Sequence, residues 1–204
     1  MAPVYENGVL SELDEEYLYD PAILESLDFD KCSVKFNPPI SPSHPGPGLR
    51  VRPLSTNDYD KGFMKLLSQL TEVGEVSREQ FLRRFHDMKQ CPNTYYVTVV
   101  EDTETDHPGD AVIGTATLVV EQKFIRGCAV RGRLEDVVVN DTYRGKQLGK
   151  LIVTTIMMLA REMNCYKISL DCKDKMIPYY ESLGFSLEPG NSNYMTMRIP
   201  KCSL

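Results

Sequence analysis

The chain has 204 residues, enough for one folded domain with an appended segment, and it needs no disulfide or metal to bury a core. Its formal net charge of −6 argues against a general nucleic-acid-binding protein, because such proteins usually carry a basic excess. Residues 1–50 contain nine acidic and three basic residues, whereas residues 51–204 contain twenty of each. The whole acidic excess therefore lies in the first quarter of the chain.

Metal sites and membrane spans leave patterns that this sequence lacks. Six cysteines and three histidines are scattered without paired spacing, so we expect no bound metal. The longest nearly apolar run, residues 151–160, is about half the length that a membrane span needs. The first residues are acidic and show neither the basic nor the apolar region of a signal peptide, which predicts a cytoplasmic protein.

The N-terminal region, residues 1–48, differs in composition from the rest. Residues 1–36 are acidic, and Asp20-Pro-Ala within them predicts a short helix that begins at proline. Residues 37–48 contain five prolines and two glycines, which is typical of a linker or of an extended segment. We therefore expect the folded domain to comprise residues 49–204.

From residue 49 onward, strand and helix signals alternate. Ser77 and Gln80 form a capping box that predicts the start of a helix, and residues 148–163 show a regular helical apolar spacing. Strands are expected at 49–54, 95–102, 111–124, 132–140, 165–172 and 193–199, and helices at 56–70, 77–89, 148–163 and 174–184. This order predicts an α/β fold, with a mixed sheet flanked by helices.

A basic, glycine-containing loop, Arg144-Gly-Lys-Gln-Leu-Gly149, lies between an apolar strand and the regular helix. Backbone N–H groups at a helix N-terminus can hold an anion, and glycine allows close approach. A Walker A phosphate loop is excluded because three residues, not four, separate the two glycines. Two interpretations stay open on the loop alone: an anion cradle, or a basic turn that caps a helix.

With its neighbouring strand and helix, the loop resembles the pyrophosphate loop of the GCN5-related N-acetyltransferase superfamily, which binds acetyl-CoA. Gln147 stands where the superfamily usually has glycine. From about Tyr19 to Lys201 the chain closely resembles the glucosamine-6-phosphate N-acetyltransferase family, most clearly in residues 40–54, 70–81, 135–150, 164–172 and 178–185.

The resemblance implies a mixed, mostly antiparallel twisted sheet with a splayed central strand pair, flanked by helices. It implies direct acetyl transfer, through a ternary complex, from acetyl-CoA to the 2-amino group of glucosamine 6-phosphate in UDP-N-acetylglucosamine biosynthesis. Acetyl-CoA, without a metal, would be held by Val137, Val138, Val139, Arg144, Gly145, Lys146, Gln147, Leu148 and Gly149. Met176 departs from an asparagine that is common in the superfamily.

The same resemblance assigns catalytic and sugar-binding residues. Tyr180 would protonate the coenzyme A thiolate, and Asp171 and Glu135 would orient the amine or accept its proton. Glu135 and Asp136 are adjacent, so they face one substrate only if the strand bulges. For each carboxylate, a structural ion pair stays an alternative. The sugar phosphate would be bound by Thr71, Lys123, Arg126, Glu135, Asp136, Tyr166, Lys167 and Arg198.

The family forms homodimers in which the partner chain helps to build the sugar site, so a homodimer is expected here. Two other functions stay open: acetylation of another amine, in a protein or a polyamine, by an enzyme of the same fold, and acyl-CoA binding without catalysis. Seven basic and three acidic residues within 123–150 favour an anionic substrate over a polyamine.

Overall fold

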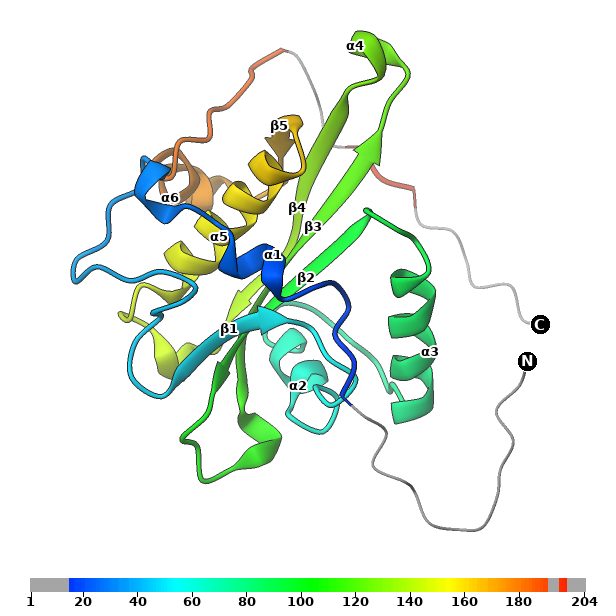
Figure 1. The fold of residues 1–204 in the computed structure, drawn as a ribbon, viewed down its shortest axis with the longest axis vertical. Coiled ribbons are helices and arrows are strands. Elements are labelled where there is room, and N and C mark those ends of the chain that lie inside the picture. The colour runs from blue at the N-terminus through cyan, green and yellow to red at the C-terminus, as the bar shows by residue number, and fades with distance from the viewer. Residues whose placement is uncertain (1–14, 191–194, 198–204) are drawn as a thin grey trace.

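The computed structural model describes residues 15–190 and 195–197, and its centre is a five-stranded sheet (Figure 1). The strands lie in the order β1-β2-β3-β4-β5, so every strand is beside its neighbour in the sequence. The first four strands pair antiparallel, and only β4 and β5 run parallel. Their bounds are Leu49–Pro53, Tyr95–Asp102, Val112–Gln122, Val130–Val139 and Cys165–Ser169.

Helices cover both faces of this sheet, and the alternation of side chains along β2 explains why. Tyr96 and Val100 belong to the apolar cluster that surrounds α5 (Leu148–Glu162). Val97 and Val99 point the other way, toward α2 (Phe63–Leu67) and α3 (Arg78–Lys89). Figure 1 accordingly shows α5 and α3 on opposite sides of the strands.

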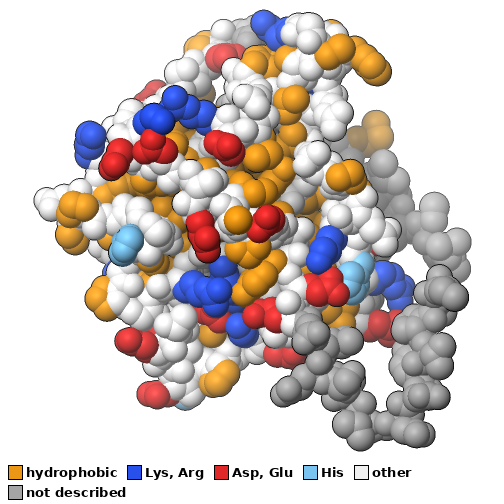
Figure 2. Space-filling model, in the orientation of Figure 1, with side chains coloured by type: hydrophobic (Ala, Val, Ile, Leu, Met, Phe, Trp, Pro, Cys, Tyr) orange, Lys and Arg blue, Asp and Glu red, His pale blue; other side chains and the backbone are white. Residues whose placement is uncertain are grey.

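An N-terminal layer packs over α5. It contains α1 (Ala22–Glu25), whose Leu24 is buried in the same cluster as the apolar face of α5. Leu18 is buried on the other cluster, and the hydroxyl groups of Tyr19 and Thr98 are 2.6 Å apart. Apolar side chains form a band across this face in Figure 2. Several residues between 15 and 48 thus belong to the same two apolar clusters as the sheet. The domain boundary expected after residue 48 stays a prediction.

The observed elements agree with the expected order, and three of them are shorter. The segment expected to be helical over 56–70 holds only the short α2, because Gly62 adopts a left-handed φ of 89° just before it. The strand expected at 165–172 is shorter and covers Cys165–Ser169. The helix expected at 174–184 divides into a 3₁₀ turn, Asp174–Met176, and α6 (Ile177–Glu181). The strand expected at 193–199 lies mostly outside the described residues.

The helix at 77–89 is found with the predicted capping box. The Ser77 hydroxyl accepts a hydrogen bond from the Gln80 N–H at 3.2 Å, and the Gln80 side chain accepts one from the Ser77 N–H at 2.8 Å.

In the described part of the chain, no helix has the length and apolar character needed to cross a bilayer.

A buried network of charged side chains joins β1, β2 and the turn that follows β1. The Arg52 guanidinium donates two hydrogen bonds to Asp58, at 2.8 and 2.7 Å, and one to Glu101 at 2.8 Å. Lys61 binds the other oxygen of Glu101 at 2.7 Å. Burial alone raises the pKa of Glu101, but the hydrogen bonds from Arg52 and Lys61 outweigh it and hold the pKa at about 2.

Candidate active site

The central strands separate halfway along their length. The parallel pairing of β4 with β5 ends at Arg133 and Ser169, while β4 continues to Val139. Within the described chain, residues 134–139 therefore pair only with β3. Their other backbone edge can accept an extended ligand as an added strand. This is the splayed strand pair that the sequence predicted, and it includes the three valines assigned to acetyl-CoA.

A bulge in β4 lies at the point of separation. Thr117 pairs with Glu135 and Thr115 with Val138, so two steps along β3 match three steps along β4. Asp136 absorbs the extra residue with a φ of 51°, a left-handed conformation that is uncommon for an aspartate. The bulge turns Glu135 and Asp136 toward one face, where both line the same pocket.

That pocket lies between the sheet and the pair α2 and α3, and its volume is about 700 Å³. Its walls are mainly apolar, with the two carboxylates of β4 and the hydroxyl groups of Thr115 and Thr117 on the sheet side. Charged and amide side chains on and just before α3 also line it: Glu75, Gln80, Arg83, Arg84 and Asp87. A cavity that combines mainly apolar walls with several polar groups is typical of a small-molecule site. The apolar residues are Leu54, Phe63, Met64, Leu67, Val76, Phe81, Phe85, Met88, Val97 and Val119.

Arg133 joins two of the predicted catalytic carboxylates. Its guanidinium donates to Glu135 on the same strand and to Asp171 beyond the end of β5. The hydrogen bond that Arg133 donates to Glu135, and to a lesser degree the one it donates to Asp171, raise the pKa of Arg133. One guanidinium therefore links a carboxylate of β4 to a carboxylate beyond β5. Arg133 was not among the sequence-predicted site residues, although its spacing of two from Glu135 on a strand places both on one face.

Asp136 is in a different electrostatic situation. The residue lines the pocket and is exposed overall, while the part of its carboxyl group that faces the protein is desolvated. This desolvation, together with the neighbouring charge of Glu135, raises the pKa of Asp136. A carboxylate with a raised pKa is a better proton acceptor than one held by an arginine.

Tyr180 lies on α6, half-buried against α5. Its ring stands 5.1 Å from that of Tyr179 and 5.8 Å from that of Phe185, both near perpendicular. Burial, and to a lesser degree the Cys172 thiol, raises the pKa of Tyr180. The phenol therefore stays protonated at neutral pH and can serve as a proton donor. Tyr179 packs closer to the helix, with its hydroxyl near Gly149.

The predicted pyrophosphate loop leads into the N-terminus of α5. Gln147 caps the helix with a φ of 58°, and Gly145 also has a positive φ of 82°. The first N–H groups of an α-helix have no partner within the helix, so they are available to an anion. Arg144 and Lys146 are exposed here, Arg144 bonded to Asp141 and Lys146 stacked 4.8 Å over the Tyr143 ring.

The predicted sugar-phosphate residues are not all brought together in the single chain. Lys123 and Arg126 stand at the tip of the β3–β4 hairpin, Lys123 just before the short helix α4 (Ile125–Cys128) and Arg126 within it (Figure 1). Five residues of strand separate that tip from Glu135, about 16 Å at 3.3 Å per residue. Thr71 is exposed after α2 and does not line the large pocket, and Arg198 lies outside the described residues.

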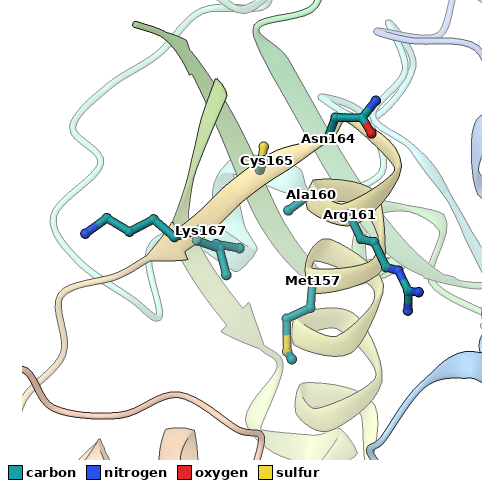
Figure 3. Close-up of a pocket in the computed structure, with 7 residues that line it drawn as sticks. Met157, Ala160, Arg161, Asn164, Cys165 and Lys167 are labelled. Carbon is teal, nitrogen blue, oxygen red and sulfur yellow. The ribbon is translucent and has the colours of Figure 1, made fainter. Parts of the chain in front are cut away.

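Tyr166 and Lys167 occupy β5, at the outer edge of the sheet. Arg126 reaches back from the hairpin tip to stack 5.2 Å over the Tyr166 ring. Lys167 borders a second, shallower hollow between β5 and the C-terminal half of α5 (Figure 3). Its side chain points away from that of Arg161 across this hollow, so the two cations do not converge on one point there. No cluster of metal-ligand side chains occurs among the described residues.

An open sheet that splays beside a basic helix-capping loop defines an acyl-CoA-dependent transferase site, and the comparisons agree. Residues 61–185 match the acetyltransferase (GNAT) family, to which this chain belongs.

A probable glucosamine 6-phosphate N-acetyltransferase of Drosophila melanogaster is 61% identical over 91% of this chain and 83% of its own length. A glucosamine 6-phosphate N-acetyltransferase of Dictyostelium discoideum is 40% identical over 68% of this chain and 85% of its own. The crystal structure of the Arabidopsis thaliana glucosamine-6-phosphate N-acetyltransferase superposes with a TM-score of 0.68. It is 36% identical and covers 74% of this chain and 99% of that one.

Proposed function

We propose that this protein transfers the acetyl group of acetyl-CoA to the 2-amino group of D-glucosamine 6-phosphate, giving N-acetyl-D-glucosamine 6-phosphate and coenzyme A. The product would serve UDP-N-acetylglucosamine biosynthesis, in the cytoplasm. The names of the relatives support the substrate. The observation that carries the chemistry is the bulge in β4, which places two carboxylates on one pocket beside an unpaired strand edge.

The unpaired edge and the loop fit acetyl-CoA. Residues 137–139 offer main-chain groups to the pantetheine arm, as a strand would. The N-terminus of α5, with Arg144 and Lys146 beside it, offers N–H groups and positive charge to the pyrophosphate. When bound, acetyl-CoA supplies an acetyl thioester whose carbonyl carbon accepts the amine. Backbone N–H groups of β4 can then donate to the carbonyl oxygen as negative charge develops on it.

Proton transfer is divided between two ends of the site. Asp136, with its raised pKa and its place on the pocket, is the group we assign to accept the amine proton. Glu135 and Asp171, both bonded to Arg133, would fix the amine's position. The protonated phenol of Tyr180 would give its proton to the departing thiolate. The new C–N bond forms as the C–S bond breaks, with no covalent enzyme intermediate.

A homodimer is part of the same proposal. Phe124 and Ile125 on the hairpin tip are 97% and 65% exposed, unusually high for large apolar side chains. The tip cations lie far along the strand from Glu135 of their own chain, which supports their action on the partner's sugar site. Light scattering should give twice the chain mass of 23.2 kDa. A single-chain mass would contradict the dimer.

The function is tested by offering three amines with acetyl-CoA and following thiol release. Glucosamine 6-phosphate should turn over far faster than glucosamine, because the phosphate meets the predicted cations, and spermidine should not react. Equal turnover of the two sugars would contradict phosphate recognition. Turnover of spermidine alone would indicate another amine as substrate. Binding of coenzyme A without any thiol release would indicate a non-catalytic module.

A further inference from the structure

A short stretch of the N-terminal layer, residues 35–38, lies against the pyrophosphate loop, and we name it the strap. The Asn37 N–H donates to the Gln147 side-chain oxygen at 3.1 Å, and the Gln147 side-chain amide donates to the Pro38 carbonyl at 3.2 Å. Both polar ends of one glutamine are thereby used on main-chain groups that are 110 and 109 positions away in the sequence.

Gln147 is also the residue that turns the chain into α5. Its φ of 58° and ψ of 12° are left-handed, a conformation that costs a residue with a side chain free energy and that glycine would adopt more easily. A glutamine therefore holds a strained position while its side chain is tied to the strap. The two hydrogen bonds can offset the cost of the left-handed backbone.

A second tie joins the strap to the same helix end. The Lys150 ammonium donates to the Lys35 carbonyl and lies 4.9 Å above the Phe36 ring. The Phe36 ring in turn stands 6.5 Å from that of Phe29, and both are packed against the apolar cluster of α5. The strap is thus anchored on the core at one side and on the first turn of α5 at the other.

The opposite end of the loop is fixed to the sheet. The Tyr143 hydroxyl donates to Asp102 at the end of β2, and the Asp141 N–H donates to the Gln69 side chain at 3.2 Å. The strap fixes the other end of the loop, at the start of α5. Residues 144–146 between the two anchors are exposed, with their main chain open to a ligand.

We propose that the strap is a structural part of the acetyl-CoA site and that Gln147 is a positioning residue for the pyrophosphate. The strap holds Gln147 in its left-handed conformation, which aims the first N–H groups of α5 at the ligand. This inference rests on the proposed function only in taking acetyl-CoA as the ligand. It adds residues 35–38, which lie outside the loop, to the machinery that binds it.

The test is the affinity for coenzyme A, measured by calorimetry on the full chain. Gln147→Gly permits the left-handed turn but no longer holds it, because both hydrogen bonds to the strap are lost and glycine has more backbone freedom. We expect the dissociation constant for coenzyme A to rise about tenfold, the size of two neutral hydrogen bonds. The KM for acetyl-CoA should rise with it, whereas the KM for glucosamine 6-phosphate should not change.

Two further variants sharpen the result. Gln90→Gly makes the same substitution at an exposed position that ends α3, on the other side of the sheet, and should leave coenzyme A affinity unchanged. Lys150→Met cuts the second tie and keeps most of the side-chain stem, so it should weaken affinity in the same direction. Faster hydrogen exchange at the amides of residues 145–149 in Gln147→Gly would support loss of positioning.

Unchanged or improved coenzyme A affinity in Gln147→Gly would overturn the inference, because the hydrogen bonds between Gln147 and the strap would then contribute nothing to binding. An equal loss in Gln90→Gly would overturn it as well. The proposed function fails separately, if the unmodified protein binds no coenzyme A in the same calorimeter.

Discussion

The two neighbouring carboxylates of β4 show what a single irregular residue does for the site. On a regular strand Glu135 and Asp136 would face opposite sides, and only one could reach a substrate. The left-handed Asp136 interrupts the alternation of side chains along β4. Leu134 and Val137 therefore face α5, while Glu135 and Asp136 face the large pocket. The sequence indicated that a bulge was needed, but adjacency alone does not predict where a ladder breaks.

Tyr180 tests the division of proton transfer at the residue scale. Tyr180→Phe removes only the hydroxyl and keeps the ring packed on Tyr179 and Phe185. Because the thiolate would then leave without a proton donor, kcat should fall about 100-fold. The KM for acetyl-CoA should change little. Steady-state kinetics with glucosamine 6-phosphate measures both.

The matched control is Tyr179→Phe, on the same helix and half-buried beside it. Its hydroxyl lies against Gly149, and burial raises its pKa to about 12. We expect kcat to change less than twofold. An unchanged kcat in Tyr180→Phe would remove the acid role, and an equal loss in both variants would indicate a packing effect.

At the scale of elements, local signals predicted those helices and strands whose ends they mark. The Ser77 capping box gave α3, and the apolar spacing of residues 148–163 gave α5. The segment 56–70 failed as a helix because Gly62 turns left-handed in its middle, and periodicity does not register one φ angle. The contact of the strap with Gln147 could not be predicted, since it joins residues far apart in the sequence.

Gly62 also marks a close approach between two loops. A Cβ atom at this position would lie 2.2 Å from the Gly109 carbonyl oxygen, and the φ of 89° is already unfavourable for other residues. Gly62→Ala should therefore lower the free energy of unfolding by about 3 kcal/mol, measured by urea denaturation.

Gly74 provides the comparison, because its φ of 75° is similar and no atom lies within 4 Å of its added Cβ. Gly74→Ala should cost only about 1 kcal/mol, the price of the backbone conformation alone. Equal losses at the two glycines would show that the Gly109 contact is relieved without cost.

At the scale of the whole molecule, the acidic excess lies in residues 1–50 of the sequence and the basic excess in residues 123–150. The resemblance carried by residues 135–150 and 178–185 predicted the fold, while its assignment of site residues stays a prediction. Arg133, which ties Glu135 to Asp171, and the placement of Lys123 and Arg126 on a distant hairpin tip emerge only from the three-dimensional arrangement. The spacing of residues along the sequence does not show which residues of different strands lie side by side.

The buried network of Arg52, Asp58 and Glu101 should govern acid stability. The pKa of Glu101 in the folded chain, about 2, lies below its ordinary value of 4.5. Its contribution is therefore full above about pH 4.5 and is lost as the pH falls toward 2. Glu101→Gln should lower the free energy of unfolding by about 3 kcal/mol at pH 7 and flatten its decline below pH 4.5.

Urea denaturation at pH 7, 4 and 3 measures this, with Asp110→Asn as the control. Asp110 pairs with Lys65 at the surface, so its loss should cost well under 1 kcal/mol. If Glu101→Gln declines with acid in parallel with the unmodified protein, the network is not the source of the acid dependence.

The pH profile of kcat/KM for glucosamine 6-phosphate is the most direct test of whether the bulge makes Asp136 the acceptor of the amine proton. Because a base must be deprotonated, activity should fall as the pH drops through the raised pKa of Asp136. Asp136→Asn should lower kcat/KM about 100-fold at neutral pH and abolish the limb assigned to this carboxyl. A variant that keeps both the rate and the acidic limb of the unmodified protein would contradict the account.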